Sequence, residues 1–345
     1  MTEGRRRLWM AGYAVATFLA FPHPLRFVGP DTVLDLGAVV AYAVPVCLVL
    51  GLRGLTPRRA AASAFGWTVL GHGMVLHFIY VVTVTYGHAP ALIGVVAPFA
   101  LAVYAAVLAA IFGAVWRWLE ERGVAGALVA ALLWTALDHL RSFALTGWPW
   151  ATLGYAQHLN PAMLGLAQWT GVYGLSFATV LGGVAALEAV SAWRRGVRPG
   201  TPTLVALGLL AGMLVFGFAT RIQPGVNDGM GASLRIAAVQ GNIDQGVKWN
   251  RDWVERTLGI YEDLSRRAAA DGARVIVWPE TAVPGALDVD TAMRRRVHRL
   301  ARETGASFVI GSVGIDAGAG DVAQANRENI TTSSRERRRR RRCGE

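Results

Sequence analysis

The chain has 345 residues, of which 53% are hydrophobic and 17% charged, and its formal net charge is +11 at pH 7. Because an ordinary soluble domain has about 25% charged residues, this composition excludes a disordered protein and a typical cytosolic enzyme. The two cysteines, Cys47 and Cys343, form neither a disulfide framework nor a metal-ligand spacing. Apolar runs fill the chain up to Thr220, and a composition typical of soluble α/β proteins begins after Ser233. We therefore predict a membrane domain followed by a soluble one.

Seven apolar segments in the first two thirds of the chain are candidate membrane spans. They cover residues 8–21, 32–52, 60–86, 91–116, 124–143, 162–190 and 201–220. A spanning helix needs about 20 apolar residues, so the first segment is the shortest candidate. The arginines before it are also typical of a signal peptide, but no small-residue cleavage site follows and Pro22-His23-Pro24 predicts a turn. We therefore count it as a span.

The distribution of arginine between these segments predicts their orientation. With the N-terminus inside, the inner segments carry eleven arginines, namely Arg5, Arg6, Arg7, Arg53, Arg58, Arg59, Arg117, Arg122, Arg194, Arg195 and Arg198. The outer segments carry three, Arg26, Arg141 and Arg221. Since cytoplasmic loops of membrane proteins are enriched in Lys and Arg, this asymmetry supports seven spans. An odd number of spans places everything after Thr220 on the outer face.

Four ionisable residues within the predicted spans are candidates for a specific role. His72 and His77 are five residues apart, which does not place them on one helical face, and no carboxylate lies nearby in the sequence. We interpret them as helix-packing or interfacial side chains. Asp138 and Arg141 are three residues apart, so we expect an ion pair along one helix. This pair either lowers the free-energy cost of placing charged side chains near the membrane interface, or it contacts a lipid headgroup.

Aromatic and glycine-rich motifs follow the fifth predicted span. Gly147-Trp148-Pro149-Trp150 and Gly154-Tyr155 have the aromatic content of a membrane interface, where tryptophan and tyrosine lie at the level of the headgroups. The segment 171–177 contains two glycines, which permit the close approach of another backbone or of an acyl chain.

The second part of the chain alternates between strand and helix patterns. Short buried strands are predicted at 234–239, 274–278 and 307–313. Asn250 is a candidate N-cap and Gly272 a stop signal for a helix after the first strand, and a second helix is expected at 291–304. This alternation predicts an α/β sheet with covered faces.

Glu280 directly follows the second of these strands, within Trp278-Pro279-Glu280-Thr281. In α/β proteins, ligands bind at the carboxyl ends of the strands. A carboxylate at such a position can serve as a general base. It can also simply cap the next turn, and the spacing of the residues leaves both interpretations open.

Taken together and in this order, these motifs resemble the apolipoprotein N-acyltransferase family. The resemblance rests on the segments 234–243, Lys248-Trp249 and 275–284, and in the membrane half on Arg141, Gly147-Trp148-Pro149-Trp150, Gly154-Tyr155 and 171–177. It runs from Leu8 to Asp316. Trp278-Pro279-Glu280 alone would indicate only the nitrilase superfamily, and the seven preceding spans make the resemblance specific. It implies a polytopic α-helical membrane domain followed by an α/β nitrilase-like domain, an α-β-β-α sandwich that is incomplete here.

The resemblance implies an integral enzyme of the bacterial inner membrane whose C-terminal domain lies on the periplasmic face. It would move an acyl chain from a phospholipid donor to the N-terminal amine of a diacylglyceryl apolipoprotein, without a cofactor or a metal. The family uses a Glu–Lys–Cys triad in which Cys forms a thioester, Glu is the general base and Lys stabilises the oxyanion. Glu280 matches the Glu. The resemblance also implies four substrate-binding candidates, Trp249, Gln240, Trp148 and Arg141.

The remainder of the triad has no match in this sequence. The family's Lys and Cys follow the Glu at a distance, but no Lys follows Glu280 and Lys248 precedes it. Cys343 lies within an arginine run that is typical of a solvated tail. Because the resemblance to the family ends near Gly318, we expect a frameshift or a truncation. We therefore expect the chain as written to be inactive.

The predicted organisation is a transmembrane domain over 1–222, the N-terminal part of a nitrilase-like (carbon-nitrogen hydrolase) domain over 233–316, and an aberrant, disordered Arg-rich tail over 317–345. Basic tails bind anionic lipid or nucleic acid, but a tail on the outer face meets no nucleic acid, so we exclude that partner. Two other functions stay open. A transporter with an extracytoplasmic domain would need charged residues at mid-span. A non-catalytic lipid- or lipoprotein-binding scaffold would need no triad.

Overall fold

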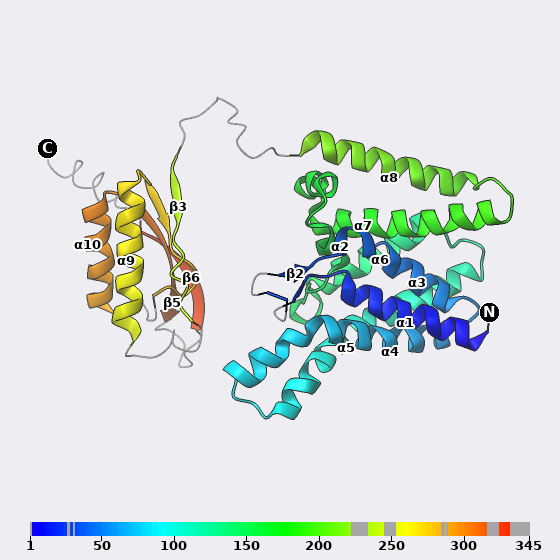
Figure 1. The fold of residues 1–345 in the computed structure, drawn as a ribbon, viewed down its shortest axis with the longest axis horizontal. Helices are drawn as coiled ribbons and strands as arrows, with labels where there is room; N and C mark the ends of the chain where they lie inside the picture. The colour runs from blue at the N-terminus through cyan, green and yellow to red at the C-terminus, as the bar shows by residue number, and fades with distance from the viewer. Residues whose placement is uncertain are drawn as a thin grey trace. The chain divides into compact units, whose positions relative to one another are not determined.

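The computed structural model describes residues 2–25, 28–29, 32–221, 234–244, 253–283, 287, 289–315 and 324–331, with 314–315 and 324–331 described as backbone only. The chain divides into two compact units, Met1–Gly225 and Val226–Glu345. Figure 1 labels the elements of both units.

The first unit is built from α-helices (Figure 1). These are α1 (Glu3–Leu19), α2 (Gly37–Val40), α3 (Ala43–Leu52), α4 (Pro57–Val75), α5 (Ala91–Glu120), α6 (Ala127–Arg141), α7 (Pro161–Arg194) and α8 (Thr201–Thr220). A 3-10 helix at Leu76–Phe78 and a π-helix at Val81–Tyr86 follow α4. Two further 3-10 helices, Ala144–Thr146 and Leu153–Gln157, lie between α6 and α7. The strands β1 (His23–Pro24) and β2 (Val33–Leu34) pair antiparallel.

Local signals in the sequence explain where several helices begin and end. The side chain of Thr56 accepts a hydrogen bond from the backbone N–H of Arg59 at the start of α4, and Asn160 does the same for Met163 in α7. Proline follows both caps. It has no backbone N–H, but an N–H at this first helical position would have no partner within the helix, so no hydrogen bond is lost. Gly196, with a φ of +68°, follows α7 in the left-handed conformation that favours glycine after a helix.

Glycine brings helix backbones close together in this unit. A Cβ atom on Gly113 of α5 would lie 2.9 Å from the carbonyl oxygen of Ala60 in α4. A Cβ atom on Gly217 of α8 would overlap the carbonyl oxygen of Ala162 in α7, and one on Gly165 would overlap that of Gly217. In lipid, helices associate through close packing and not through the hydrophobic effect, so these contacts require glycine.

Within the described residues, three helices are long and apolar enough to cross a membrane, namely α5, α7 and α8. The other four segments predicted as spans also contain helix, but in shorter or more polar pieces. The segment 32–52 is divided between α2 and α3, and the segment 60–86 changes from α-helix to 3-10 and π-helix after Val75. Helix α1 has 17 residues and begins with charged side chains. Helix length and composition therefore do not establish the predicted count of seven.

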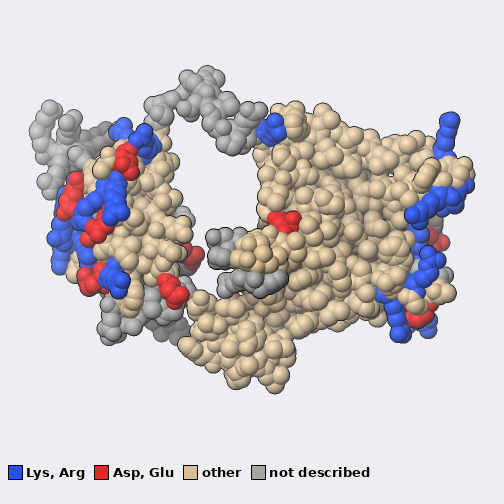
Figure 2. All heavy atoms as spheres, viewed as in Figure 1, with Lys and Arg blue, Asp and Glu red and all other residues tan. Residues whose placement is uncertain are grey.

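Arginine side chains gather at one end of the helical unit. Figure 2 shows them as blue spheres at the end where α1 begins, while the middle of this face is almost free of charge. The arginines that belong to this end flank the start of α1, the connection from α3 to α4, the end of α5 and the connection from α7 to α8.

The second unit contains a four-stranded sheet in the order β3-β4-β5-β6. The strands β3 (Ile236–Ala238), β4 (Val275–Val277) and β5 (Ser307–Ile315) are parallel, and β6 (Gln324–Thr331) pairs antiparallel with β5. Helices α9 (Val254–Ala270) and α10 (Thr291–Thr304) connect the parallel strands. They lie side by side on one face of the sheet (Figure 1).

An apolar core joins these two helices to the sheet. Ile276 of β4 and Phe308 of β5 are fully buried and adjacent in register. Leu258 of α9 and Leu300 of α10 belong to the same cluster. Burying an aliphatic or aromatic side chain of this size contributes about 1.5–3 kcal/mol, so this cluster is the main source of stability of the unit.

Charged side chains tie α9 to α10 outside the core. The Arg296 guanidinium donates through Nε to Glu262 at 2.5 Å and through Nη1 to Glu255 at 2.6 Å. The hydrogen bond with Glu262 raises the pKa of Arg296 above its usual value. Arg266 of α9 also pairs with Glu303 of α10 at 3.4 Å. The Arg266–Glu303 pair is exposed and contributes little to stability, whereas the Arg296–Glu262 pair is partly buried and fixes how the two helices lie against each other.

The structure contains the three strands and the 291–304 helix that the sequence predicts for this unit. The predicted N-cap Asn250 lies outside the described residues, and α9 is described from Val254. Strand β6 was not expected, because its residues show no apolar alternation and lie within the predicted disordered tail. Its backbone pairs with the edge of β5 along eight residues, a pairing that side-chain periodicity does not reveal.

Candidate active site

The carboxyl ends of three neighbouring strands bring polar residues to one edge of the sheet. Gln240 follows β3, Glu280 follows β4, and Ser312 lies near the end of β5. Because β3, β4 and β5 are adjacent and parallel, these positions share an edge. The sheet therefore places Gln240 and Glu280, both predicted from the sequence, at the location where α/β proteins bind ligands.

The turn that carries Glu280 rests directly on β5. A Cβ atom on Gly311 would lie 2.6 Å from the carbonyl oxygen of Pro279 and 2.7 Å from the Cα atom of Glu280. One residue further on, Thr281 has a φ of +49°, which is unfavourable for a side chain branched at Cβ. The chain then returns to the sheet, where Val283 forms a parallel bridge with Ser312. The close contact at Gly311 thus fixes the position of the Glu280 backbone.

Trp278 fixes the strand end from the helix side. Its indole Nε1–H donates a hydrogen bond to Ser265 Oγ at 2.8 Å. Tyr261 stacks on the indole with ring centroids 5.1 Å apart, and Phe308 packs edge-on at 6.1 Å. Because Trp278 is only 3% exposed, it is a rigid support and not a ligand contact.

Tyr261 also supports the neighbouring strand end. Burial raises the pKa of its hydroxyl, and a hydrogen bond with the backbone of Gly241 opposes that rise. A Cβ atom on Gly241 would lie 2.9 Å from the Tyr261 ring, so the chain after Gln240 passes directly over this ring. One aromatic pair, Tyr261 and Trp278, therefore holds both of the strand ends that carry Gln240 and Glu280.

The Glu280 side chain is exposed at this edge, as is that of Gln240. An exposed carboxylate on a rigid backbone can accept a proton from a nucleophile that approaches from solvent. A general base needs this combination of access and fixed position. Within the described residues, no group of three His, Cys, Asp or Glu side chains is placed to hold a metal ion.

A second polar cluster is buried in the helical unit around Asp138 and Arg141. The predicted ion pair is present, with Nη2 of Arg141 3.4 Å from Oδ1 of Asp138. Asp138 also accepts a hydrogen bond from Ser176 of α7 at 2.9 Å, and Arg141 donates to Thr152 at 2.8 Å. The Ser176 hydroxyl accepts a hydrogen bond from the Gly154 N–H at 2.9 Å. The pair therefore ties the segment that follows α6 to helix α7.

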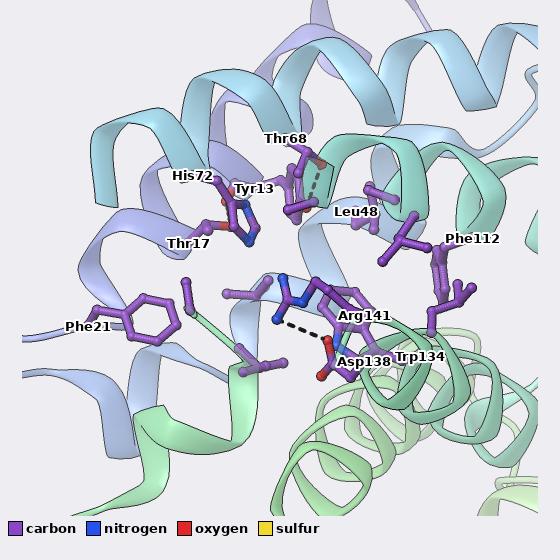
Figure 3. Close-up of a pocket in the computed structure, with 17 residues that line it drawn as sticks. Tyr13, Thr17, Phe21, Leu48, Thr68, His72, Phe112, Trp134, Asp138 and Arg141 are labelled. Atoms are coloured by element: carbon purple, nitrogen blue, oxygen red, sulfur yellow. Dashed lines mark hydrogen bonds and ion pairs between the residues drawn. The ribbon is translucent and has the colours of Figure 1, made fainter. Parts of the chain in front are cut away.

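This ion pair lies beside a small cavity of about 50 Å³. Figure 3 shows Arg141, His72 and Tyr13 directed toward the same space from different helices, with Tyr13 hydrogen-bonded to Thr68. Both Nε of Arg141 and Nδ1 of His72 are buried without a hydrogen-bond partner among the described residues. A water molecule needs about 10–15 Å³ and two or more polar partners, so this space suits a few waters.

The Trp148 side chain is half-buried and lies beside other aromatic rings. Its ring is 6.4 Å from that of Tyr104 and 5.9 Å from that of Trp150. Its backbone N–H donates to the carbonyl oxygen of Arg141 at 3.0 Å, and the Tyr104 hydroxyl donates to the same oxygen at 2.9 Å. The structure therefore connects Trp148 to Arg141 through the backbone.

The structure thus brings the predicted site residues together in pairs. Arg141 and Trp148 are neighbours in the first unit, and Gln240 and Glu280 share an edge in the second. Trp249, Lys248 and Cys343 lie outside the described residues. His77, unlike His72, does not line the cavity beside Arg141.

The sequence does not predict a polar role for three members of the buried cluster, namely Ser176, Thr152 and Tyr13, although Ser176 lies within the segment 171–177. Ser176 is 38 residues from Asp138, its hydrogen-bond partner. The sequence around Ser176, Thr152 and Tyr13 is that of ordinary helices and loops. No local signal in the sequence distinguishes them, because their roles depend on contacts between distant segments.

Comparison with known proteins extends this picture. The family model described as "Apolipoprotein N-acyltransferase N-terminal domain" matches residues 13–185, which is half of the chain. The chain belongs to the apolipoprotein N-acyltransferase family. The carbon-nitrogen hydrolase family model matches residues 235–334, so the acyltransferase family assignment and the nitrilase-like fold of the second unit agree.

Curated relatives named apolipoprotein N-acyltransferase support the assignment. The relative from Geobacter metallireducens is 35% identical over 311 residues, which is 89% of this chain and 57% of the relative. Those from Pseudomonas syringae pv. tomato and Pseudomonas putida are 34% and 35% identical over 82% and 79% of this chain, and 55% and 53% of the relatives. The chain thus spans just over half the length of these acyltransferases.

Proposed function

We propose that this chain carries the membrane domain and the general base of an apolipoprotein N-acyltransferase. In this reaction an acyl chain passes from a phospholipid to the N-terminal amine of a diacylglyceryl apolipoprotein. The observation that carries the proposal is the position of Glu280, which lies at a strand end on a backbone fixed by Gly311 and Trp278. Both family models match the parts of the chain that the proposal needs.

Glu280 would take the proton from a cysteine thiol as that thiol attacks the phospholipid ester. The thiolate is the nucleophile and the thiol is not, so a base within reach raises the rate. Glu280 would give this proton to the oxygen of the departing lysophospholipid as the thioester forms. It would then accept a proton from the lipoprotein amine as the amine attacks the thioester, and return it to the departing cysteine thiolate. The family's triad includes a Lys that follows the Glu, and no Lys follows Glu280 in this sequence. We therefore predict that this chain is inactive by itself.

Arg141 and Trp148 are proposed to serve the substrate in different ways. Trp148 is half-buried among aromatic rings and can contact an acyl chain. Arg141 is only 4% exposed and binds Asp138 and Thr152, so it is a positioning residue that holds Trp148 through the backbone. Gln240 and Trp249 remain proposed substrate contacts on the grounds of the family resemblance.

We also propose seven spans with the N-terminus in the cytoplasm of a bacterial cell and the second unit on the periplasmic face of the inner membrane. The gathering of arginines at one end of the helical unit supports this orientation. The domain boundaries proposed from the sequence are 1–222, 233–316 and 317–345.

Complementation of a bacterium depleted of its own N-acyltransferase tests the function. We expect the chain alone to give no rescue, and a chimera that continues after Asp316 with the corresponding part of the Geobacter metallireducens relative to restore lipoprotein acylation. Glu280→Gln in the chimera should abolish rescue, whereas Glu303→Gln, which removes an exposed carboxylate on α10, should not. Rescue by Glu280→Gln would refute the base assignment, and a well-expressed chimera without activity would favour a non-catalytic scaffold.

A further inference from the structure

An open groove with a charged end runs along the first unit between α1, α3 and α7, with α8 at its edge. Its volume is about 880 Å³. Most of the residues that line it are apolar or small. The exceptions include three arginines, Arg5, Arg53 and Arg194, together with Trp9. The groove is therefore amphipathic, which distinguishes it from an ordinary crevice between apolar helices.

The charged and apolar residues are separated along its length. Arg53 directly follows α3 and Arg194 ends α7, whereas Tyr42 and Gly182 line the groove eleven and twelve residues earlier on the same elements. A helix rises 1.5 Å per residue, so this separation is roughly 16–18 Å. Arg5 lies near the start of α1, at the end of the unit where the arginines gather (Figure 2). The positive charge is thus confined to one end.

The three positive charges have no acidic partner among the residues that the structure describes. Within the part of the chain that the structure describes, no ion pair involves Arg5, Arg53 or Arg194. Glu188, which lies six residues before Arg194 on α7, does not line the groove and accepts a hydrogen bond from Thr203 of α8 at 2.7 Å. An anion at this end of the groove would therefore neutralise charge that the described protein leaves uncompensated.

We propose that this groove binds an anionic glycerophospholipid of the surrounding membrane. Its phosphate lies among the three arginines, and its acyl chains lie along the apolar walls of α3 and α7. Guanidinium groups bind phosphate with two parallel hydrogen bonds, and basic pockets between membrane helices recognise anionic headgroups. Trp9 marks the headgroup level, where tryptophan is enriched. With the orientation proposed above, this lipid belongs to the cytoplasmic leaflet and is not the acyl donor used at Glu280.

Native mass spectrometry tests the proposal on the full chain released from nanodiscs that contain equal amounts of phosphatidylglycerol and phosphatidylcholine. We expect phosphatidylglycerol to remain bound in preference to phosphatidylcholine. The triple variant Arg5→Gln, Arg53→Gln, Arg194→Gln should reduce this binding by about tenfold or more, because each arginine near the headgroups contributes to attraction of anionic lipid. A matched variant removes the same charge from the same end but outside the groove, with Arg58→Gln, Arg59→Gln and Arg198→Gln, and should bind as the parent does.

A second variant tests the apolar part of the groove. Ala186→Trp fills the wall on α7 without changing the charge, and we expect it to displace phosphatidylglycerol although all arginines remain. Equal losses in the two triple variants, or full binding by Ala186→Trp, would overturn the proposal, because the lipid would then be held by general attraction to a basic surface. Circular dichroism verifies the fold of each variant. Acylation does not enter the readout, so the outcome is independent of the proposed function.

Discussion

At the scale of single residues, buried hydrogen bonds determine how firmly the proposed active site is held. The Trp278 indole N–H is buried and has Ser265 as its acceptor, and the Ser265 hydroxyl donates in turn to the carbonyl oxygen of Tyr261 at 2.7 Å. Removing an acceptor from a buried donor costs more than the bond itself is worth. The support that Trp278 gives to Glu280 therefore depends in part on the Ser265 hydroxyl.

Ser265→Ala should lower the free energy of unfolding by about 1–3 kcal/mol, because the Trp278 N–H would be left without an acceptor in the core. The control is Thr257→Val on the same helix, which removes a buried hydroxyl that has no partner among the described residues. This control should be neutral or stabilising. Chemical denaturation followed by tryptophan fluorescence measures both, and equal losses would contradict the assigned role of Ser265.

Breaking the ion pair of Asp138 and Arg141 should cause a larger loss of stability. Asp138→Asn leaves the buried Arg141 charge without its partner, which costs about 3–5 kcal/mol. Glu121→Gln removes a partner of Arg117 that is 45% exposed, at 3.6 Å, so it should cost less than about 1 kcal/mol. Thermal unfolding in detergent micelles compares the two. A stable Asp138→Asn protein would show that the pair is not essential to the helical unit.

At the scale of elements, the contact between β5 and the turn after β4 positions Glu280. Gly311→Ala would place a Cβ atom 2.6 Å from the Pro279 carbonyl oxygen and 2.7 Å from the Glu280 Cα. We expect a loss of about 1–3 kcal/mol from overpacking, and lower activity of the chimera described above. Gly259→Ala on α9 meets no atom within 4 Å and should stabilise by about 0.5–1 kcal/mol. Unchanged activity in Gly311→Ala would contradict the positioning role.

The elements also show how far the sequence predicts the structure. The run Val275–Val277 and the helix Thr291–Thr304 are predictable because composition and turn signals agree locally, and the structure adds Asp290 as the helix cap. Strand β6 and the division between α2 and α3 are not, since each depends on neighbours that are distant in the sequence. The strand-end position of Glu280 could be predicted, whereas its support by Gly311, Trp278 and Ser265 could not, because no pattern reports contacts between separate strands and helices.

At the scale of the whole molecule, the proposed seven spans place successive loops on opposite sides of the membrane. In a variant without Cys47 and Cys343, a single cysteine at Leu159 should react with a membrane-impermeant maleimide in spheroplasts. A single cysteine at Val197 should react only after lysis. Both parent side chains are exposed, by 62% and 54%, so accessibility within the protein does not limit the reaction. The opposite pattern would reverse the orientation, and labelling of both would change the number of spans.

The glycine contact between α7 and α8 has a mechanical consequence. Helix α8 is the last helix before the second unit, and the carbonyl oxygen of its last residue, Thr220, accepts a hydrogen bond from Gln168 of α7 at 2.7 Å. The contact of Gly165 with Gly217 lies within one turn of this bond. The hydrogen bond and the glycine contact together hold the end of α8 against α7. The last turn of α8 is thus anchored to α7 by backbone packing, and a larger residue at Gly165 or Gly217 would loosen that end of the helix first.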